Sequence, residues 1–92
     1  MYLEENEEIV ALSVGMKKPY IKGLEYYIDQ FCVKPNQQGK GLGSTFLKSI
    51  EKDIKNDGMV AMMLNTEKGF PSEKFYLKNN FDILEELIIL VK

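Results

Sequence analysis

The sequence has 92 residues, of which 45% are hydrophobic and 28% are charged, and its formal net charge is −2. These values predict one small globular domain that spans residues 1–92. A net negative charge does not favour binding to nucleic acid, because nucleic-acid-binding proteins usually present a basic surface.

Cys32 is the one cysteine of the sequence, which contains no histidine. A single cysteine forms no internal disulfide, which is typical of a reducing compartment, so we expect a cytoplasmic protein. Because no histidine can activate it, we expect Cys32 to be a buried structural thiol. The lack of histidine also excludes Ser-His-Asp chemistry and histidine-ligated metals, and no metal site is expected. No segment predicts a signal peptide or a membrane span.

The first third of the chain predicts three strands. Residues 8–16 and 24–33 are rich in β-branched, apolar and aromatic side chains, which favours strands. Residues 17–23 contain a proline and a glycine and predict the hairpin loop between them. Residues 1–6 are interpreted as a short strand that pairs with 8–16 across a turn at Asn6-Glu7.

The middle of the chain predicts a helix over residues 42–57 followed by a buried strand over residues 59–64. Apolar residues recur with the spacing of one helix face at Leu42, Phe46, Leu47, Ile50 and Ile54. Gly58 fits a left-handed position that ends the helix. Residues 59–64 are short and apolar on both faces, which suits a central strand.

The last third predicts a short helix over residues 70–80, with Pro71 in its first turn and Asn80 in a left-handed cap position. Residues 81–92 are apolar and β-branched and predict a final strand. The order β-β-β-α-β-α-β, with a right-handed crossover between 24–33 and 59–64, predicts an α/β (α+β) fold with a mixed, mostly antiparallel sheet.

A glycine-rich loop precedes the 42–57 helix, with glycines at Gly39, Gly41 and Gly43. Glycines let the backbone approach a ligand closely, and the first amides and the dipole of the helix favour an anion there. Lysines gather around this loop at Lys34, Lys40, Lys48, Lys52 and Lys55. The spacing fits neither a P-loop nor a dinucleotide fingerprint. The residues alone leave an anion site and a simple glycine-rich turn as open alternatives.

Two sequence blocks resemble the GCN5-related N-acetyltransferase (GNAT) family. "VKPNQQGKGLGSTFL" contains Q-x-x-G-x-G from Gln38 to Gly43 and is similar to the family's acetyl-CoA motif, [RQ]-x-x-G-x-[GA]. "SEKFYLKNNF" resembles the family's A-x-x-F-Y-x-K-x-G-F block, with Asn80 in place of its glycine. The resemblance covers nearly all of residues 1–92 and implies an acyl-CoA N-acyltransferase-like fold. The strand and two helices with which family members normally begin have no counterpart here.

The resemblance implies an acetyl-CoA site in which the loop amides hold the pyrophosphate and the end of the 24–33 strand holds the pantetheine arm. The implied site residues are Phe31, Val33, Gln38, Gly39, Lys40, Gly41, Leu42, Gly43 and Ser44. For this, the strand must splay away from its parallel neighbour. Asp29 and Gln30 place polar groups in an otherwise apolar strand, which predicts either a bulge or cleft wall there or a strand with one wet face.

The resemblance also implies acetyl transfer to a primary amine of a small molecule or peptide. Tyr76 stands where many family members have a tyrosine acid, and the alternative is a core tyrosine. Glu25, Tyr27 and Asp29 lie on one strand face by alternation. Asp29 is the candidate general base, against the alternative of an exposed strand carboxylate.

Three functional interpretations remain open from the sequence. They are an N-acetyltransferase, a CoA-binding remnant without turnover, and a non-catalytic module that keeps only the fold. The open edge of the first strand also suggests a homodimer, in which a second copy covers that edge and supplies the missing wall of the acceptor groove.

Overall fold

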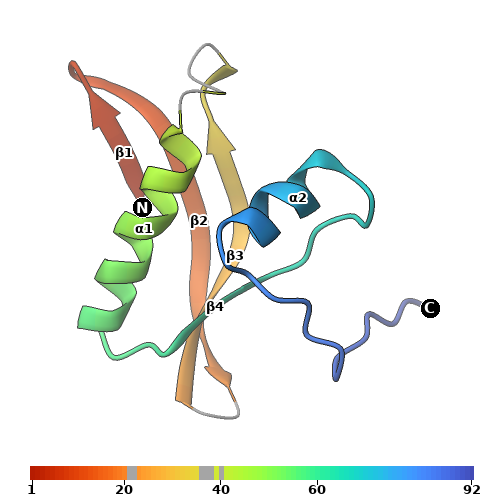
Figure 1. The fold of residues 1–92 in the computed structure, drawn as a ribbon. Coiled ribbons are helices and arrows are strands. Elements are labelled where there is room, and N and C mark those ends of the chain that lie inside the picture. Colours follow the sequence, from red (N-terminus) through yellow and green to blue (C-terminus); the bar gives the residue numbers. More distant parts are fainter. Residues whose placement is uncertain (21–22, 36–38, 40) are drawn as a thin grey trace.

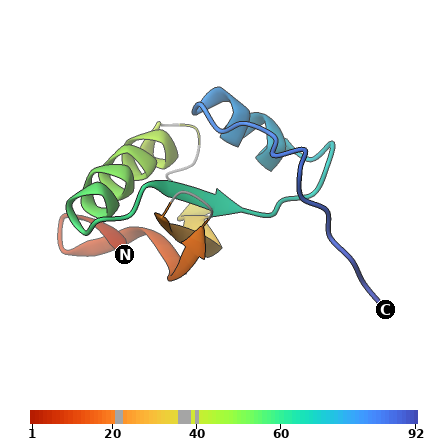
Figure 2. The same cartoon turned by 90° about the horizontal axis from the view of Figure 1, so that it is seen from below.

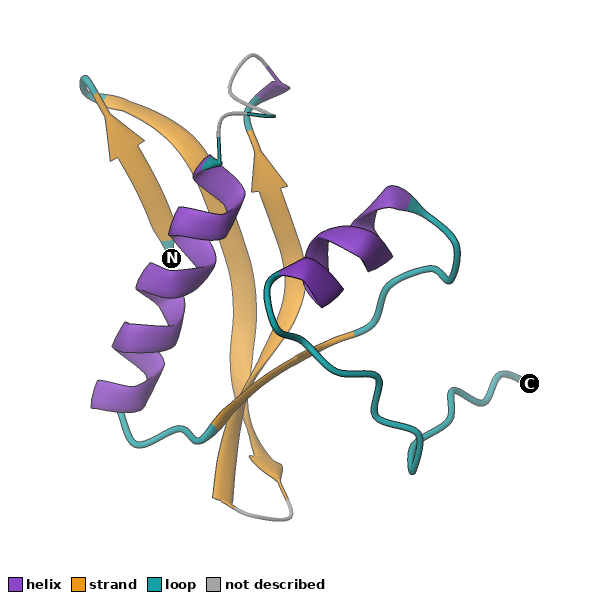
Figure 3. Ribbon diagram, viewed as in Figure 1, coloured by secondary structure: helices purple, strands orange, loops and turns teal. Residues whose placement is uncertain are grey.

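The computed structural model describes residues 1–20, 23–35, 39 and 41–92. Three consecutive strands are followed by a helix, a fourth strand and a second helix, and Figures 1 and 3 show their arrangement. In chain order they are β1 (Tyr2–Glu5), β2 (Glu8–Tyr20), β3 (Gly23–Val33), α1 (Leu42–Asn56), β4 (Ala61–Leu64) and α2 (Pro71–Lys78).

The strands form one sheet in the order β1-β2-β3-β4. The pairs β1–β2 and β2–β3 are antiparallel, and β3–β4 is parallel. The mixed, mostly antiparallel sheet of an α+β fold is therefore confirmed. Its parallel pair exists because α1 carries the chain from the end of β3 back to the start of β4.

The first hairpin turns at Asn6 and Glu7, as predicted. Their φ angles are 51° and 63°, and Glu5 pairs with Glu8 on either side of them. A two-residue loop with two positive φ angles matches the twist of the flanking strands. The short first strand is therefore confirmed.

The second hairpin differs from the prediction because β2 continues through Tyr20. Residues 17–20 pair with residues 23–26 of β3 instead of forming a loop, and residues 21–22 lie outside the described part of the chain. Proline is tolerated at Pro19 because β1 reaches only as far as Leu12 along β2. Beyond that point the described residues pair with β2 on the β3 side alone. A missing N–H group on the other, open side of β2 disturbs no ladder.

A bulge in β3 changes which side chains face the helices. Val14 pairs with Gln30 and the next residue, Gly15, pairs with Ile28, so Asp29 is an extra residue in β3. Of the alternatives left open for the polar pair at 29–30, the structure has the bulge. Beyond it the alternation is reset, and Phe31 faces the helix side together with Ile28.

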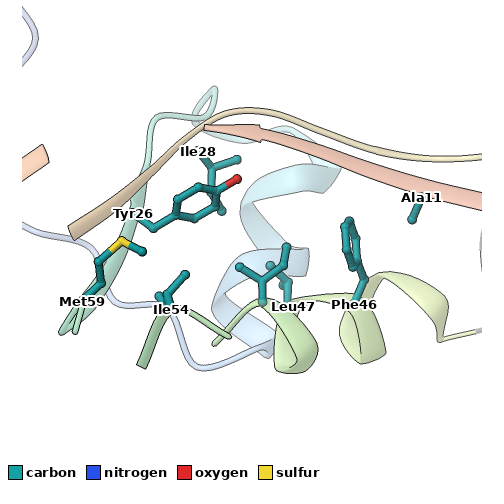
Figure 4. Close-up of a cluster of buried hydrophobic side chains, with 8 residues drawn as sticks. Ala11, Tyr26, Ile28, Phe46, Leu47, Ile54 and Met59 are labelled. Carbon is teal, nitrogen blue, oxygen red and sulfur yellow. The ribbon is translucent and has the colours of Figure 1, made fainter. Parts of the chain in front are cut away.

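The core lies between the sheet and α1. The predicted apolar stripe of α1 buries Phe46, Leu47, Ile50 and Ile54. Figure 4 shows Tyr26 and Ile28 of β3 lying over this stripe. The hydroxyl groups of Ser13 and Tyr26 lie 3.1 Å apart and are hydrogen-bonded inside the core. The left-handed positions predicted after the two helices are confirmed, with φ of 82° at Gly58 and 70° at Asn80.

The strand predicted over residues 81–92 is wrong. The structure describes all of these residues, and none of them belongs to a strand. Their aliphatic composition favours an extended strand, but an isolated strand without a ladder partner is unstable in water. The observed order is therefore β-β-β-α-β-α.

Both helices cover the same face of the sheet, as the view in Figure 2 shows. The opposite face exposes apolar side chains of β2, including Leu12, Val14 and Met16. Within the described residues, no helix is long and apolar enough to cross a membrane.

Candidate functional site

The strands β3 and β4 diverge toward the upper end of the sheet in Figure 1. Their parallel pairing joins Glu25–Ile28 with Ala61–Leu64 and ends there. Beyond Ile28, β3 continues along β2 as far as Val33, whereas β4 leads away toward α2. The splay predicted between these two strands is confirmed, and it opens the sheet directly below the start of α1.

The glycine-rich loop leads into an open helix terminus. Gly39 and Gly41 have φ angles of 82° and 77°, and a Cβ atom at either position would meet nothing within 4 Å. Gly41 is the N-cap, and its carbonyl accepts the first helical hydrogen bond from the Thr45 amide at 3.1 Å. Three amides precede that donor and have no partner inside the helix. They belong to Leu42, Gly43 and Ser44.

The electrostatics of this terminus favour an anion. The N-cap residue Gly41 has no side chain that could cap the helix, and no acidic residue lies in the first turn. The positive end of the helix dipole is therefore not neutralised by the helix itself.

Gly43 serves a different purpose from the two glycines before it. A Cβ atom at Gly43 would lie 2.9 Å from the ring of Phe75 and 3.7 Å from the side chain of Val33. Its small size lets α1 pass close to α2 and to the end of β3. Packing between these elements therefore requires a residue without a side chain at this position.

An aromatic cluster joins the end of β3 to both helices. The Phe31 ring stacks on Phe46 of α1 at 5.4 Å between centroids and lies 5.9 Å from Phe75 of α2. Tyr76 meets Phe31 edge-on at 6.2 Å and Phe81 at 5.3 Å. These contacts hold α2 against the splayed end of β3 and place Tyr76 next to it.

Among the described tyrosines, Tyr76 has a pKa that departs clearly from the ordinary value. Burial, and to a lesser degree the negative charge of the nearby Cys32 thiolate, raises the pKa of Tyr76 above 10.0. Tyr76 is therefore a neutral phenol at neutral pH, as a proton donor must be. Cys32 itself is exposed. The prediction of a buried thiol is wrong, because the bulge turns this residue to the face of the sheet that no helix covers.

The bulge separates Asp29 from Glu25 and Tyr27, the two residues that were predicted to share its face of β3. Asp29 is the bulge residue and is exposed. Tyr27 accepts a hydrogen bond from the Asn65 side chain, and the Lys18 ammonium lies 4.1 Å from the centre of its ring. Glu25 is only 5% exposed, and its Oε2 atom has no hydrogen-bond partner among the described residues.

The lysines around the glycine loop are less available than the sequence suggested. Lys34 forms an ion pair with Glu8, and Lys55 forms one with Glu51 at 3.1 Å. Lys48 and Lys52 are exposed on α1 and form no ion pair within the described residues. Gln38 and Lys40, both predicted to bind CoA, lie outside the described residues. In the remainder of the chain, no group of three or more acidic or cysteine side chains could hold a metal ion.

A large groove in the described part of the chain lies elsewhere. Its volume is about 1170 Å³, and it runs along β4, α2 and the segment after α2, with Tyr27 and Tyr76 among its lining residues. None of the described glycine-loop residues lines it. The groove therefore reaches the candidate acid but not the anion site.

Sequence reasoning missed two features of this site. The ring of Phe31 ties β3 to both helices, although only its backbone was expected to act. The adjacent aromatic residues Phe75 and Tyr76 were a signal for such a cluster. No sequence pattern indicated the hydrogen bond from Asn65 to Tyr27, because it joins residues that are far apart in the sequence.

Residues 1–81 match the sequence model described as the acetyltransferase (GNAT) family. The chain belongs to this family. The resemblance found in the two sequence blocks is thereby confirmed, since both blocks fall inside the matched range. A search of curated proteins finds no match to this GNAT chain.

Solved structures support the same fold for this GNAT chain. A putative acetyl transferase from Pyrococcus furiosus is 23% identical with a TM-score of 0.82, and the match covers 98% of this chain and 60% of that one. Glucosamine-6-phosphate N-acetyltransferase from Arabidopsis thaliana is 21% identical with a TM-score of 0.77, covering 99% and 63%. Ribosomal-protein-alanine N-acetyltransferase from Brucella melitensis biovar Abortus 2308 is 11% identical with a TM-score of 0.80, covering 99% and 67%.

The GNAT chain is shorter than these neighbours. It spans about three fifths of the length of the structures that it matches, for example 56% of an integron cassette protein from the mobile metagenome of Cole Harbour Salt Marsh, which is 25% identical with a TM-score of 0.77. At these identities the likeness establishes the fold. What the neighbours bind or acetylate belongs to those proteins.

Proposed function

We propose that this chain is an acetyl-CoA-dependent N-acetyltransferase that acts on a primary amine of a small molecule or peptide. One observation carries the proposal. The sheet opens between β3 and β4 directly beside an uncapped helix terminus, in a chain of the acetyltransferase family. An opening of this kind suits an extended ligand that has an anionic end.

The donor would lie along the splayed end of β3. The backbone of Phe31 and Val33 would bind the pantetheine arm. The pyrophosphate would accept hydrogen bonds from amides of the loop and of the first turn of α1, with Gln38 and Lys40 completing the site. The described members of this phosphate site are Gly39, Gly41, Leu42, Gly43 and Ser44. Acetyl-CoA supplies the thioester that is cleaved.

Tyr76 and Asp29 would carry the two proton transfers. In the reaction a bond forms between the amine nitrogen and the carbonyl carbon, and the carbon–sulfur bond breaks. Tyr76 would give its proton to the departing sulfur, a role that its contact with Phe31 at the splayed end of β3 supports. Asp29 would take a proton from the amine through water. Its exposure at the bulge supports access from solvent.

A CoA-binding module without turnover is the second candidate function. It is favoured by the sheet face opposite the helices, where no element of the described residues forms a wall for an acceptor. For the location, the exposed Cys32 thiol supports a reducing compartment such as the cytoplasm.

Calorimetric titration and a thiol-release assay distinguish these functions. We expect CoA and acetyl-CoA to bind at micromolar concentrations, and we expect thiol release from acetyl-CoA with at least one member of a panel of amines and amino-terminal peptides. Binding without thiol release would favour the module. No heat of binding at high micromolar CoA would contradict both functions.

A further inference from the structure

Tyr27 is held in place from both neighbouring strands of the sheet. The Lys18 ammonium of β2 lies 4.1 Å from the centre of its ring, and its hydroxyl accepts a hydrogen bond from the side-chain amide of Asn65, the first residue after β4. Its neighbours in β3, Tyr26 and Ile28, belong to the core against α1, so Tyr27 projects from the opposite face of the sheet. Side chains from three strands are therefore joined across that face.

The Tyr27–Asn65 hydrogen bond lies where the opening between β3 and β4 begins. Ile28 and Leu64 form the last pair of the parallel ladder. In a continued ladder the next pair would be Asp29 and Asn65, but Asp29 is the bulge residue and the two strands separate there. The Tyr27–Asn65 hydrogen bond therefore joins the two strands at the base of the opening.

The base of the opening is closed on its helix side as well. Ile28 is only 5% exposed, and Leu64 packs against the core cluster. Leu64, Asn65 and Tyr27 line the same groove as Tyr76, the candidate acid. The opening therefore has a closed end, and that end shares a groove with the residue proposed to protonate the departing sulfur.

We propose that the Tyr27–Asn65 hydrogen bond limits the length of the acyl group of the donor, so that these two residues select acetyl over longer acyl groups. This inference rests on the proposed function, because it takes the donor to be an acyl-CoA along the end of β3. The start of α1 lies at the Val33 end of β3, since a Cβ atom at Gly43 would lie 3.7 Å from the Val33 side chain. With the pyrophosphate there, the acyl end points toward the base of the opening.

The selection follows from what a longer acyl chain would have to displace. An acetyl group ends short of the Tyr27–Asn65 hydrogen bond, whereas a chain several methylenes longer must push the Tyr27 ring aside. That movement breaks the hydrogen bond and also removes the ring from the Lys18 ammonium, which it attracts. A site discriminates between ligands when one of them must break contacts that the other leaves intact.

Calorimetric titration with CoA, acetyl-CoA and hexanoyl-CoA tests this inference without requiring turnover. We expect the wild-type chain to bind hexanoyl-CoA about tenfold more weakly than acetyl-CoA, which corresponds to the loss of one hydrogen bond. Tyr27→Phe and Asn65→Ala each remove one partner and should reduce this difference to less than about threefold. Their affinity for CoA itself should stay unchanged. Tyr27→Phe keeps the ring and its contact with Lys18, so its melting temperature should stay close to that of the wild type.

Ser72→Ala is the matched control. The Ser72 hydroxyl is hydrogen-bonded to the hydroxyl of Thr66, the residue after Asn65, at 2.6 Å. The variant therefore breaks an exposed hydrogen bond of the same segment and leaves the Tyr27–Asn65 hydrogen bond in place. It should keep the wild-type difference between acetyl-CoA and hexanoyl-CoA.

The outcomes separate this inference from the donor site itself. Equal affinity of the wild-type chain for acetyl-CoA and hexanoyl-CoA, or a difference that Tyr27→Phe and Asn65→Ala both retain, would overturn the inference and leave the donor site standing. An equal loss of affinity for all three ligands in these variants would also overturn it, because the hydrogen bond would then support the fold and not select the acyl group. A wild-type chain that binds none of the three ligands would overturn the inference together with the proposed function.

Discussion

Gly41 and Gly58 stand at the two ends of α1 in nearly the same backbone conformation. Their φ angles are 77° and 82°, and a Cβ atom at either position would meet nothing within 4 Å. Substitution therefore strains the backbone equally at the two sites. The sites differ in what surrounds them, because the Gly41 end presents free amides and the Gly58 end does not. The pair separates the effect of strain from the effect on a bound anion.

Gly41→Ala and Gly58→Ala should each lower the free energy of unfolding by about 1 kcal/mol, because an alanine is strained at positive φ. Only Gly41→Ala should weaken CoA binding, by about tenfold, since its methyl group would stand where the phosphates bind. Calorimetric titration of both variants measures this difference. Equal CoA affinities in the two variants would contradict a phosphate site at this loop.

Tyr76 provides a second residue-level test, through pH. Its pKa is raised above 10.0 mainly by burial, so the folded chain favours the neutral phenol more than the unfolded chain does. This stabilisation is present below pH 10 and is lost as the pH rises through the folded pKa, because the unfolded chain ionises first.

Tyr76→Phe should therefore flatten the fall of the melting temperature between pH 9 and pH 11. The same variant should slow thiol release by about 100-fold, the range expected for a lost general acid, while CoA affinity stays unchanged. Tyr2→Phe, on the exposed first strand, is the control and should keep the wild-type rate. An unchanged rate in Tyr76→Phe would exclude this residue as the acid.

At the scale of elements, the approach of α1 to α2 depends on Gly43. Its missing side chain leaves room for the Phe75 ring, which would lie 2.9 Å from a Cβ atom there. The ring also packs against Phe31 at the end of β3. The distance between the two helices therefore determines where α2 holds Tyr76 beside the splayed strand.

Gly43→Ala should destabilise the chain by about 1–3 kcal/mol, as overpacking does. Phe75→Leu should cost about as much alone, because it removes ring contacts. In the double variant the smaller leucine makes room for the methyl group, so the two losses should sum to less than their separate values. Chemical denaturation of the four proteins measures this coupling. Strict additivity would mean that the two residues do not contact each other.

The elements show which parts of the fold were predictable. The predicted helix over 42–57 agrees with α1 to within one residue. Its apolar stripe is a local sequence pattern, and the structure buries that stripe in the core. The strand over 81–92 was wrong, because a strand needs a neighbour and composition does not supply one. The continuation of β2 past Pro19 was missed because the short reach of β1, which makes the proline harmless, cannot be inferred from the proline itself.

Those parts of the candidate site that depend on short sequence patterns were predictable. The glycine spacing and the Phe75-Tyr76 pair pointed to the elements that the structure brings together. The polar residues at 29–30 suggested the bulge at Asp29, but they did not indicate which side chains the bulge would turn to the other face of the sheet. It moves Phe31 to the helix side and Cys32 to the open side, and this change of face follows from the register with β2.

At the scale of the whole molecule, the two faces of the sheet differ. One face is packed against both helices, whereas the other exposes aliphatic side chains of β2. The chain also spans about three fifths of the length of its structural neighbours. An acetyltransferase needs a surface for its acceptor as well as for its donor, and the site proposed above accounts for the donor alone. A partner for the exposed surfaces would therefore affect acceptor choice more than CoA binding.

The short parallel ladder between β3 and β4 has a consequence for the order of folding. The β2–β3 hairpin joins neighbouring segments through a long ladder, whereas β3 meets β4 only after the intervening α1 has closed the loop. Contacts between residues distant in sequence form more slowly than local ones. The hairpin and the helix can therefore assemble first and the parallel ladder last. The opening beside α1 is then bounded on one side by the last strand to join the sheet.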